Sequence, residues 1–266
     1  ICILGCGAIG GALAKALQDM DGVSGVVLYD LHPEKAKALQ SQFPKSRCAS
    51  SLDEAIEGAD LIVEAANQAA VKEILPKALE RGKDAMILSV GALLDFEFRA
   101  RCKAMAAQKG RKIYIPSGAV CGIDGIGAAA QEEIEEVMLM SYKPPAAFEG
   151  VEYFRKRGID LTKITRPKVV FDGWAREAVY YFPKNVNVAA TIALAGVGFE
   201  KTRVKLVVDP RATKNTHRII VKGKFGEIEI WNRNEEFPSN PRTSYLAALS
   251  AISAIKKIAG TVWVGV

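Results

Sequence analysis

The chain has 266 residues, of which 49% are apolar, 25% charged and 8% aromatic. These fractions exclude a disordered, collagen-like or disulfide-scaffold protein, and the length allows one large domain or two small ones. Lys and Arg total 36 against 30 acidic residues, a net charge of +6 without any block of five basic residues. This pattern favours small anionic ligands and predicts no nucleic-acid partner.

Five cysteines occur, at positions 2, 6, 48, 102 and 121, with no CxxC pair. Their odd number and scattered spacing predict reduced thiols that fill small spaces, no metal site and a cytoplasmic protein. The apolar start, Ile1–Leu4, is too short for a signal peptide or a membrane span, so we expect no membrane partner.

The first 116 residues alternate short apolar runs with longer helical patterns. The apolar runs predict strands over Ile1–Leu4, Gly25–Tyr29, Leu61–Glu64, Ala85–Ser89 and Lys112–Ile115. The periodic runs predict helices over Ile9–Met20, Pro33–Phe43, Ala69–Arg81 and Asp95–Lys109. This alternation is typical of βαβ units, so we expect an α/β domain with a parallel sheet.

After Pro116 the pattern changes, beginning with a Gly-rich stretch, Ser117–Gly127, that predicts a loop. Strands are predicted over Glu135–Tyr142, Val169–Phe171, Arg203–Asp209, Thr216–Lys222 and Glu227–Trp231, with a turn at 222–226 joining the last two as an antiparallel pair. Helices are predicted over Trp174–Phe182, Val186–Gly196 and Ser244–Ile258. We expect an α+β domain with an open mixed sheet, and a final helix too apolar to stand in water.

A GxGxxG motif, Gly5-Cys6-Gly7-Ala8-Ile9-Gly10, connects the first predicted strand to the first predicted helix. In a dinucleotide site the first glycine permits the tight turn, the second lets the backbone approach the pyrophosphate, and the third lets the helix approach the sheet. Free N–H groups at the helix start attract phosphate. The context therefore predicts a Rossmann domain in which Gly5, Gly7, Ala8, Ile9 and Gly10 bind the cofactor, although glycines that merely close a turn are the alternative.

Asp30 ends the second predicted strand, 20 residues after Gly10. Its carboxylate can accept a hydrogen bond from a ribose 2′-hydroxyl and would repel a 2′-phosphate, which favours NAD over NADP. The nearby His32 and Lys35 leave NADP possible. FAD is less favoured, because no second dinucleotide motif follows.

The chain has two histidines, and His217 lies where a loop enters a predicted strand. Imidazole titrates near neutral pH, at about 6.5 when unperturbed, and so suits proton transfer. From the residues alone, a hydrogen-bonded structural imidazole is the favoured interpretation. His32 is expected to be exposed beside the cofactor loop.

The chain resembles the L-aspartate dehydrogenase family over nearly its whole length. The segments that carry the resemblance are Gly5–Leu13, Glu64–Glu73, Leu88–Leu93, Tyr114–Ile126, Phe171–Gly196, Val204–His217, Gly223–Ile230 and Asn240–Ser250. The most specific are the Ser117-Gly118-Ala119 loop, the run 182–190 and the pair Asn215 and His217. The segment 149–165 is longer and more charged than the family pattern, which predicts a surface insertion.

The resemblance implies oxidation of L-aspartate with NAD(P) and water to oxaloacetate and ammonia, linked to NAD biosynthesis. It implies that His217 is the catalytic residue and that Ala119 and Asn187 line the cofactor site near the nicotinamide. For Asn187, an amide that caps its own helix is the alternative.

Aspartate carries two carboxylates, so its pocket needs cationic or N–H donors. Lys184 and Asn185, before the helix predicted at Val186–Gly196, could supply them, as could Ser117 with the backbone of the loop that it begins. A solvated lysine and an ordinary interdomain turn are the alternatives.

We therefore expect a dinucleotide-binding domain over 1–116, completed by the C-terminal helix 242–266, and a substrate-binding and dimerisation domain over 117–241, with the active site in a cleft between them. An exposed apolar sheet face would suit a homodimer. The rival functions are a related two-domain reductase, such as a dihydrodipicolinate reductase or homoserine dehydrogenase relative, and a non-catalytic NAD sensor.

Overall fold

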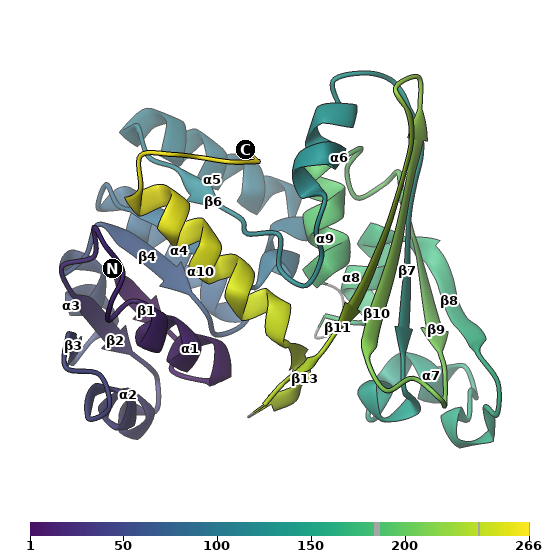
Figure 1. Ribbon diagram of the computed structural model, residues 1–266, viewed down its shortest axis with the longest axis horizontal. Helices are drawn as coiled ribbons and strands as arrows, with labels where there is room; N and C mark the ends of the chain where they lie inside the picture. Colours follow the sequence, from purple (N-terminus) through teal and green to yellow (C-terminus); the bar gives the residue numbers. More distant parts are fainter. Residues whose placement is uncertain (184–186, 239, 266) are drawn as a thin grey trace. The chain divides into compact units, whose positions relative to one another are not determined.

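The computed structural model describes residues 1–183, 187–238 and 240–265 (Figure 1). The chain divides into two compact units. The first unit comprises Ile1–Pro116 and Ala247–Val266, and the second comprises Ser117–Leu246, so the boundary near the C-terminus falls inside a helix.

The first unit contains a six-stranded sheet in which all strands are parallel, in the order β3-β2-β1-β4-β5-β6. Its strands are β1 (Cys2–Leu4), β2 (Val26–Tyr29), β3 (Ser46–Cys48), β4 (Leu61–Glu64), β5 (Asp84–Ile87) and β6 (Ile113–Tyr114). Its helices are α1 (Ala8–Ala16), α2 (Pro33–Gln40), α3 (Leu52–Glu57), α4 (Gln68–Glu80), the 3-10 helix η1 (Val90–Leu94), α5 (Phe96–Lys109) and most of α10 (Tyr245–Ala259). This strand order is that of the Rossmann fold, and it confirms the predicted fold class.

The final helix, α10, packs into the core of the first unit. Ala251 and Ile255 are fully buried there, in one cluster with Leu13 and Leu17 of α1 and its C-terminal turn. Burial of this face explains how a helix so rich in Ala, Leu and Ile is kept from water.

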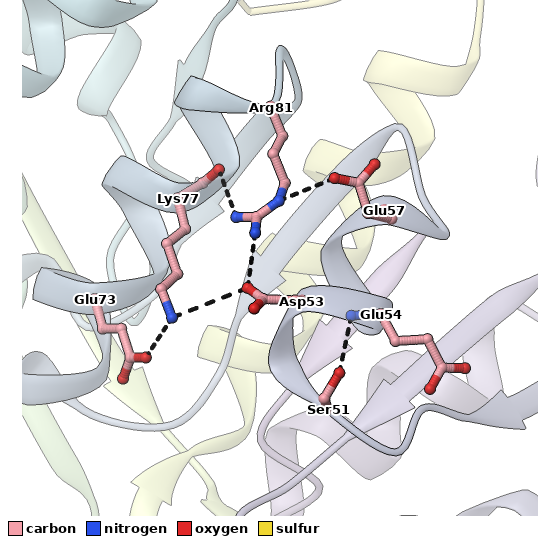
Figure 2. A network of polar contacts seen from close by, with 7 residues as sticks. All are labelled: Ser51, Asp53, Glu54, Glu57, Glu73, Lys77 and Arg81. Carbon is pink, nitrogen blue, oxygen red and sulfur yellow. Dashed lines mark hydrogen bonds and ion pairs between the residues drawn. The ribbon is translucent and has the colours of Figure 1, made fainter.

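Strand β3 and helix α3 were not predicted from the sequence. The α3 N-terminus is capped by Ser51, whose hydroxyl accepts from the Glu54 N–H at 3.1 Å. Figure 2 shows how ion pairs then join α3 to α4: Arg81 contacts Asp53 at 2.8 Å and Glu57 at 2.9 Å. With six residues, α3 is too short to show a clear helical period in the sequence, and the Ser51 cap and the buried Ala55 and Ile56 define it.

The second unit is built on a five-stranded mixed sheet in the order β11-β10-β7-β9-β8. Its strands are β7 (Ile134–Lys143), β8 (Lys168–Trp174), β9 (Thr202–Val208), β10 (Asn215–Gly223) and β11 (Gly226–Asn234), with a separate pair, β12 (Glu236–Phe237) and β13 (Asn240–Ser244). Strands β7 and β9 run parallel, and every other pair in the large sheet is antiparallel. The predicted hairpin is confirmed, since β10 and β11 pair from Asn215 with Asn234 to Gly223 with Gly226.

Helices α6 (Ile123–Ala129), α8 (Ala175–Tyr181) and α9 (Asn187–Ala195) belong to this unit, and Figure 1 shows α6 and α9 along one face of the sheet. We call this the inner face. The prediction of a loop throughout Ser117–Gly127 is wrong at its end, because α6 begins at Ile123 and buries Ile126 and Ala129. Gly-rich composition suggested a loop, but apolar burial makes this segment helical.

The segment 149–165 is not simply a surface insertion. It contains α7 (Glu152–Lys156) and the 3-10 helix η3 (Leu161–Lys163), and follows the 3-10 helix η2 (Pro145–Phe148). Tyr153 and Phe154 are buried, with the Tyr153 ring centroid 4.9 Å from that of Phe182 and the Phe154 centroid 5.6 Å from that of Phe148. The charged residues that suggested a surface segment are exposed, but its aromatic residues form part of the core.

Candidate active site

The glycine loop follows β1 in the first unit, and its shape requires glycine. Gly5 has a φ of 107°, and a Cβ atom there would lie 2.6 Å from the Ala65 carbonyl oxygen. A Cβ atom at Gly10 would lie 2.0 Å from the Gly5 carbonyl oxygen. Both glycines therefore allow close packing between the loop, helix α1 and the loop after β4.

Gly7 differs from these two glycines, because a Cβ atom there would meet nothing within 4 Å. It is the N-cap residue of α1, and no side chain caps that helix. Ala8 and Ile9, the first residues of α1, therefore present N–H groups at an open, uncapped helix start. This arrangement fits a dinucleotide pyrophosphate, which needs close backbone approach and N–H donors.

Asp30 lies beside this loop, as the motif requires. One of its carboxylate oxygens accepts from the Cys6 N–H at 2.8 Å, and the other accepts from the His32 N–H at 2.9 Å. The structure thus brings Asp30 and the glycine loop together within the first unit, while the His32 side chain is exposed. The Cys6 thiol is inert, because burial raises its pKa to about 12.

Glu64, at the end of β4, is a fully buried carboxyl that sequence reasoning missed. It accepts from the Ala66 N–H at 2.8 Å and, in the loop after β5, from the Ser89 N–H at 2.9 Å and the Ser89 hydroxyl at 2.8 Å. Burial raises its pKa, and these hydrogen bonds act in the opposite direction. Glu64 therefore ties together two loops at the carboxyl edge of the sheet, where nucleotides bind in this fold.

The second unit carries a cluster of buried polar side chains at one end of its inner face, which we call the polar cluster. Its members come from three adjacent strands: Ser141 and Lys143 of β7, Asn215 and His217 of β10, and Asn232 and Asn234 of β11. In the sheet register Ser141 lies opposite His217, which in turn lies opposite Asn232. Further along the same face the residues are apolar, including Leu139 and Ile219. The burial of six polar side chains at one end of this face therefore indicates a function.

His217 is 3% exposed, and its Nδ1 lies 2.9 Å from the Ser141 hydroxyl oxygen. Burial and, secondarily, the positive charge of Lys143 lower the pKa of the imidazole to about 3. The ring is therefore neutral near pH 7, and one nitrogen can accept a proton. Burial also lowers the pKa of the Lys143 ammonium, to about 8.

The segment before α6 is held to β11 by two asparagines. The Asn234 Nδ2 donates to the Ala119 carbonyl oxygen at 2.7 Å, and the Asn232 Oδ1 accepts from the Cys121 N–H at 3.1 Å. Ala119 is thereby fixed close to the polar cluster, within the second unit. Ser117, which begins this segment, is half-buried.

Asn187 is half-buried at the first position of α9, and its carbonyl oxygen accepts from the Thr191 hydroxyl at 3.1 Å. Lys184 and Asn185, the other residues predicted in this stretch, lie outside the described residues. The cofactor-binding role of Asn187 and the substrate-binding roles of Lys184 and Asn185 stay predictions.

Of the polar cluster, the sequence pointed only to His217 and, through the family resemblance, to Asn215. A signal existed in β7, where Val137, Leu139, Ser141 and Lys143 alternate and form one buried row. A lysine in phase with buried apolar residues is unusual and could have marked the site. Within the described residues no group of three His, Cys, Asp or Glu side chains could hold a metal ion.

Three features define the class of protein: the Rossmann sheet, the glycine loop with its acidic partner Asp30, and a second unit with a buried neutral histidine. The protein is an oxidoreductase that uses a pyridine nucleotide, NAD or NADP.

Comparisons with known proteins narrow this class. The family described as aspartate dehydrogenase, C-terminal, matches residues 124–258, and that described as homoserine dehydrogenase, NAD binding domain, matches residues 5–116. The L-aspartate dehydrogenase of Methanosarcina acetivorans is 48% identical over 99% of this chain and 98% of its own length. That of Methanocaldococcus jannaschii is 40% identical over the same shares of both chains. The chain belongs to the L-aspartate dehydrogenase family.

Solved structures agree with this assignment. The crystal structure of aspartate dehydrogenase from Thermotoga maritima is similar at a TM-score of 0.76 and 26% identity, over 99% of this chain and 97% of that one. A homoserine dehydrogenase from Thiobacillus denitrificans, at a TM-score of 0.61 and 12% identity over 97% of this chain and 72% of that one, shares the fold.

Proposed function

We propose that this protein is an L-aspartate dehydrogenase, which converts L-aspartate, NAD(P) and water to oxaloacetate, ammonia and the reduced cofactor. Full-length similarity to relatives of that name supports the proposal. The observation that carries the chemistry is a buried, neutral His217 within the polar cluster. The link to NAD biosynthesis stays a prediction.

Bound NAD(P) would supply the hydride acceptor, held by the glycine loop and Asp30. Oxidation of aspartate requires that its amine be neutral when the hydride leaves Cα. A water must then attack the imine that is formed from the substrate. His217 would accept a proton at either stage once a substrate carboxylate bound beside Lys143 offsets the positive charge that helps to lower the imidazole pKa. Because Nδ1 is engaged with Ser141, we assign proton transfer to Nε2, and the Ser141 hydroxyl positions the ring.

Lys143 is the cation of the polar cluster and the candidate that we propose for holding a substrate carboxylate. Lys184, Asn185 and Ser117 remain the candidates predicted from the sequence. A carboxylate that binds beside Lys143 would stabilise its ammonium and offset the unfavourable burial of that charge. The cluster thus suits an acidic substrate better than a neutral one.

The main test is an assay of NADH formation at a wavelength of roughly 340 nm, where the reduced cofactor absorbs. Aspartate is compared with glutamate, alanine, homoserine and malate as substrates, and ammonia release is measured in parallel. We expect turnover of aspartate with equal yields of NADH and ammonia. Turnover of another substrate in place of aspartate would support a related reductase, and cofactor binding without any turnover would support a sensor.

We propose that Asp30 makes NAD the better cofactor, because its carboxylate would repel the 2′-phosphate of NADP. We expect the Asp30→Ser variant to lose NAD affinity and to gain relative activity with NADP. Measurement of kcat/KM with both cofactors tests this, and an unchanged ratio would contradict it.

We also propose a homodimer in the cytoplasm. Trp174 and Trp231 are exposed on the outer face of the second unit's sheet, which supports self-association there. All five cysteines are free, which suits a reducing compartment. Light scattering should give twice the chain mass, falling to a monomer in Trp231→Glu.

None of the helices in the described parts of the chain combines the length and apolar character needed to span a bilayer.

A further inference from the structure

Asn232 lies beside the catalytic candidate on the inner face of the second unit's sheet. In the register of β10 and β11 it is the direct partner of His217, and it is 6% exposed. Side chains of directly opposed strand residues on one face have Cβ atoms about 4.5–5.5 Å apart. The Asn232 side chain therefore lies next to that of His217 on this face.

The orientation of this amide is fixed by its partners. Its Oδ1 accepts from the Cys121 N–H at 3.1 Å, and the Cys121 Sγ lies 3.1 Å from the same oxygen. Because a backbone N–H can only donate, the oxygen must face Cys121 and the Nδ2 must face away from it.

The Asn232 Nδ2 is buried and has no hydrogen-bond partner within the described residues. An unsatisfied buried donor is rare in folded proteins and is costly unless something binds to it. The neighbouring Asn234 differs, because its Nδ2 is already used by the Ala119 carbonyl oxygen at 2.7 Å. The fold thus uses the amide nitrogen of Asn234, whereas that of Asn232, on the residue paired with His217, has no hydrogen-bond partner among the described residues.

We propose that the Asn232 Nδ2 donates a hydrogen bond to a carboxylate oxygen of the substrate, so that Asn232 helps to select the substrate. The chemistry suits this role, since a carboxylate accepts strongly from N–H donors and Lys143 in the same cluster supplies positive charge. The same side chain holds Cys121, and with it the segment that contains Ala119. This inference rests on the proposed function, because it assumes an acidic substrate at His217.

The decisive variant is Asn232→Asp, which keeps the shape and an oxygen that accepts from the Cys121 N–H. It replaces the Nδ2 donor with a second oxygen that repels a carboxylate. We expect the KM for aspartate to rise roughly 10- to 100-fold, the loss expected for one charge-assisted hydrogen bond, while the dissociation constant of NADH changes less than about twofold. An unchanged KM for aspartate would overturn the proposal and leave Asn232 as an anchor for Cys121.

The matched control is Gln131→Glu, which makes the same amide-to-carboxylate change outside the polar cluster. The Gln131 amide donates to the Gly127 carbonyl oxygen near the end of α6. We expect its KM for aspartate to stay within about twofold of wild type, since a distant exposed charge is screened by solvent. An equal rise in both variants would mean that net charge, not the Asn232 donor, sets the KM, and would overturn the proposal.

A second measurement needs no variant. A crystal structure of the wild-type protein with NADH and succinate, a dicarboxylate of the same chain length as aspartate, should place a carboxylate oxygen within about 3.2 Å of the Asn232 Nδ2. Water at that nitrogen with succinate bound elsewhere would overturn the inference. Wild-type turnover in the substrate assay tests the proposed function separately, so the two failures are distinguishable.

Discussion

The two units form their candidate sites in different ways. In the first unit the binding features are mainly backbone features, a glycine loop and an uncapped helix start, with one side chain, the Asp30 carboxylate, which accepts from the loop. In the second unit they are side chains from three strands, buried together at one end of a sheet. A backbone site is encoded by a contiguous motif, whereas a side-chain site assembles only when distant strands pair in register.

The largest effect is expected at the second site. Replacement of His217 by Asn removes the proton acceptor and should lower kcat/KM for aspartate about 10²- to 10⁴-fold. The dissociation constant of NADH, measured by fluorescence titration, should not change, because the residues predicted to bind its phosphates and ribose lie in the other unit. Activity within tenfold of wild type would remove His217 from the chemistry.

In the first site, the glycines should separate folding from binding. Gly7→Ala places a methyl group in open space and should weaken NADH binding about tenfold or more without changing the melting temperature. Gly10→Ala places a Cβ atom 2.0 Å from the Gly5 carbonyl oxygen and should destabilise the fold by about 1–3 kcal/mol.

The matched control for these glycines is Gly11→Ala, in the same helix. Its Cβ atom would make only an ordinary contact with Leu39, at 3.5 Å. We expect a gain of about 0.5–1 kcal/mol in stability with NADH binding unchanged. Equal loss of binding in Gly7→Ala and Gly11→Ala would contradict the assignment of Gly7.

The buried ammonium of Lys143 should lower the free energy of unfolding near neutral pH. Burial lowers its pKa from 10.5 to about 8, which corresponds to about 3 kcal/mol of lost stability at neutral pH. Between pH 8 and pH 10.5 the Lys143 side chain is protonated in the unfolded chain and largely deprotonated in the folded chain. Wild-type stability should therefore rise with pH over this range. Lys143→Met should therefore be more stable than wild type at pH 7 and less active, and the stability difference should shrink toward pH 10.5. Urea unfolding across this range measures it, and a constant difference would contradict the prediction.

His217 should act on stability in the acid range. Its folded pKa of about 3 lies below the ordinary value of 6.5, so the unfolded chain takes up a proton that the folded chain does not. Wild type should lose stability relative to His217→Asn as the pH falls below 6.5, by about 2 kcal/mol at pH 5. Parallel urea unfolding curves for the two proteins measure this difference. A difference that does not depend on pH would mean that the imidazole is accessible to solvent.

The smallest effect is expected far from both sites, in the ion pairs of Figure 2. Asp53→Asn removes a partner of Arg81 and Lys77 on the exposed side of α3 and α4. Exposed pairs contribute little, so the loss should be below about 1 kcal/mol, and salt should reduce it further. A double-mutant cycle with Arg81→Gln isolates the pair. A coupling energy well above 1 kcal/mol would show that these pairs, rather than capping, hold α3 in place.

The sequence predicted the first unit well because its signals are local. The long helices and the strands β1, β2, β4, β5 and β6 coincide with apolar or periodic runs, and the GxGxxG motif has fixed spacing. Strand β3 and helix α3 escaped prediction because three and six residues are too few to show a period. Glu64 escaped because its partner Ser89 lies 25 residues away, on the neighbouring strand's loop.

The second unit was predicted less completely for the same reason. His217 was identified through family resemblance, not through its neighbours. Ser141, 76 residues away, positions the imidazole, and Asn232 meets Cys121 across 111 residues. The aromatic core around Tyr153 was hidden among charged residues and was interpreted as a surface segment.

The sequence by itself determined the parallel sheet, the nucleotide loop and the family, because these depend on apolar periodicity, glycine geometry and contiguous motifs. Only the tertiary structure decided which polar side chains surround His217. Strand pairing places residues from three separate strands on one buried face, and burial then changes the pKa values of His217 and Lys143. Proximity and desolvation are properties of the folded chain. The alternation in β7 can mark Lys143 as buried, but it does not say which residues of the other strands lie beside it.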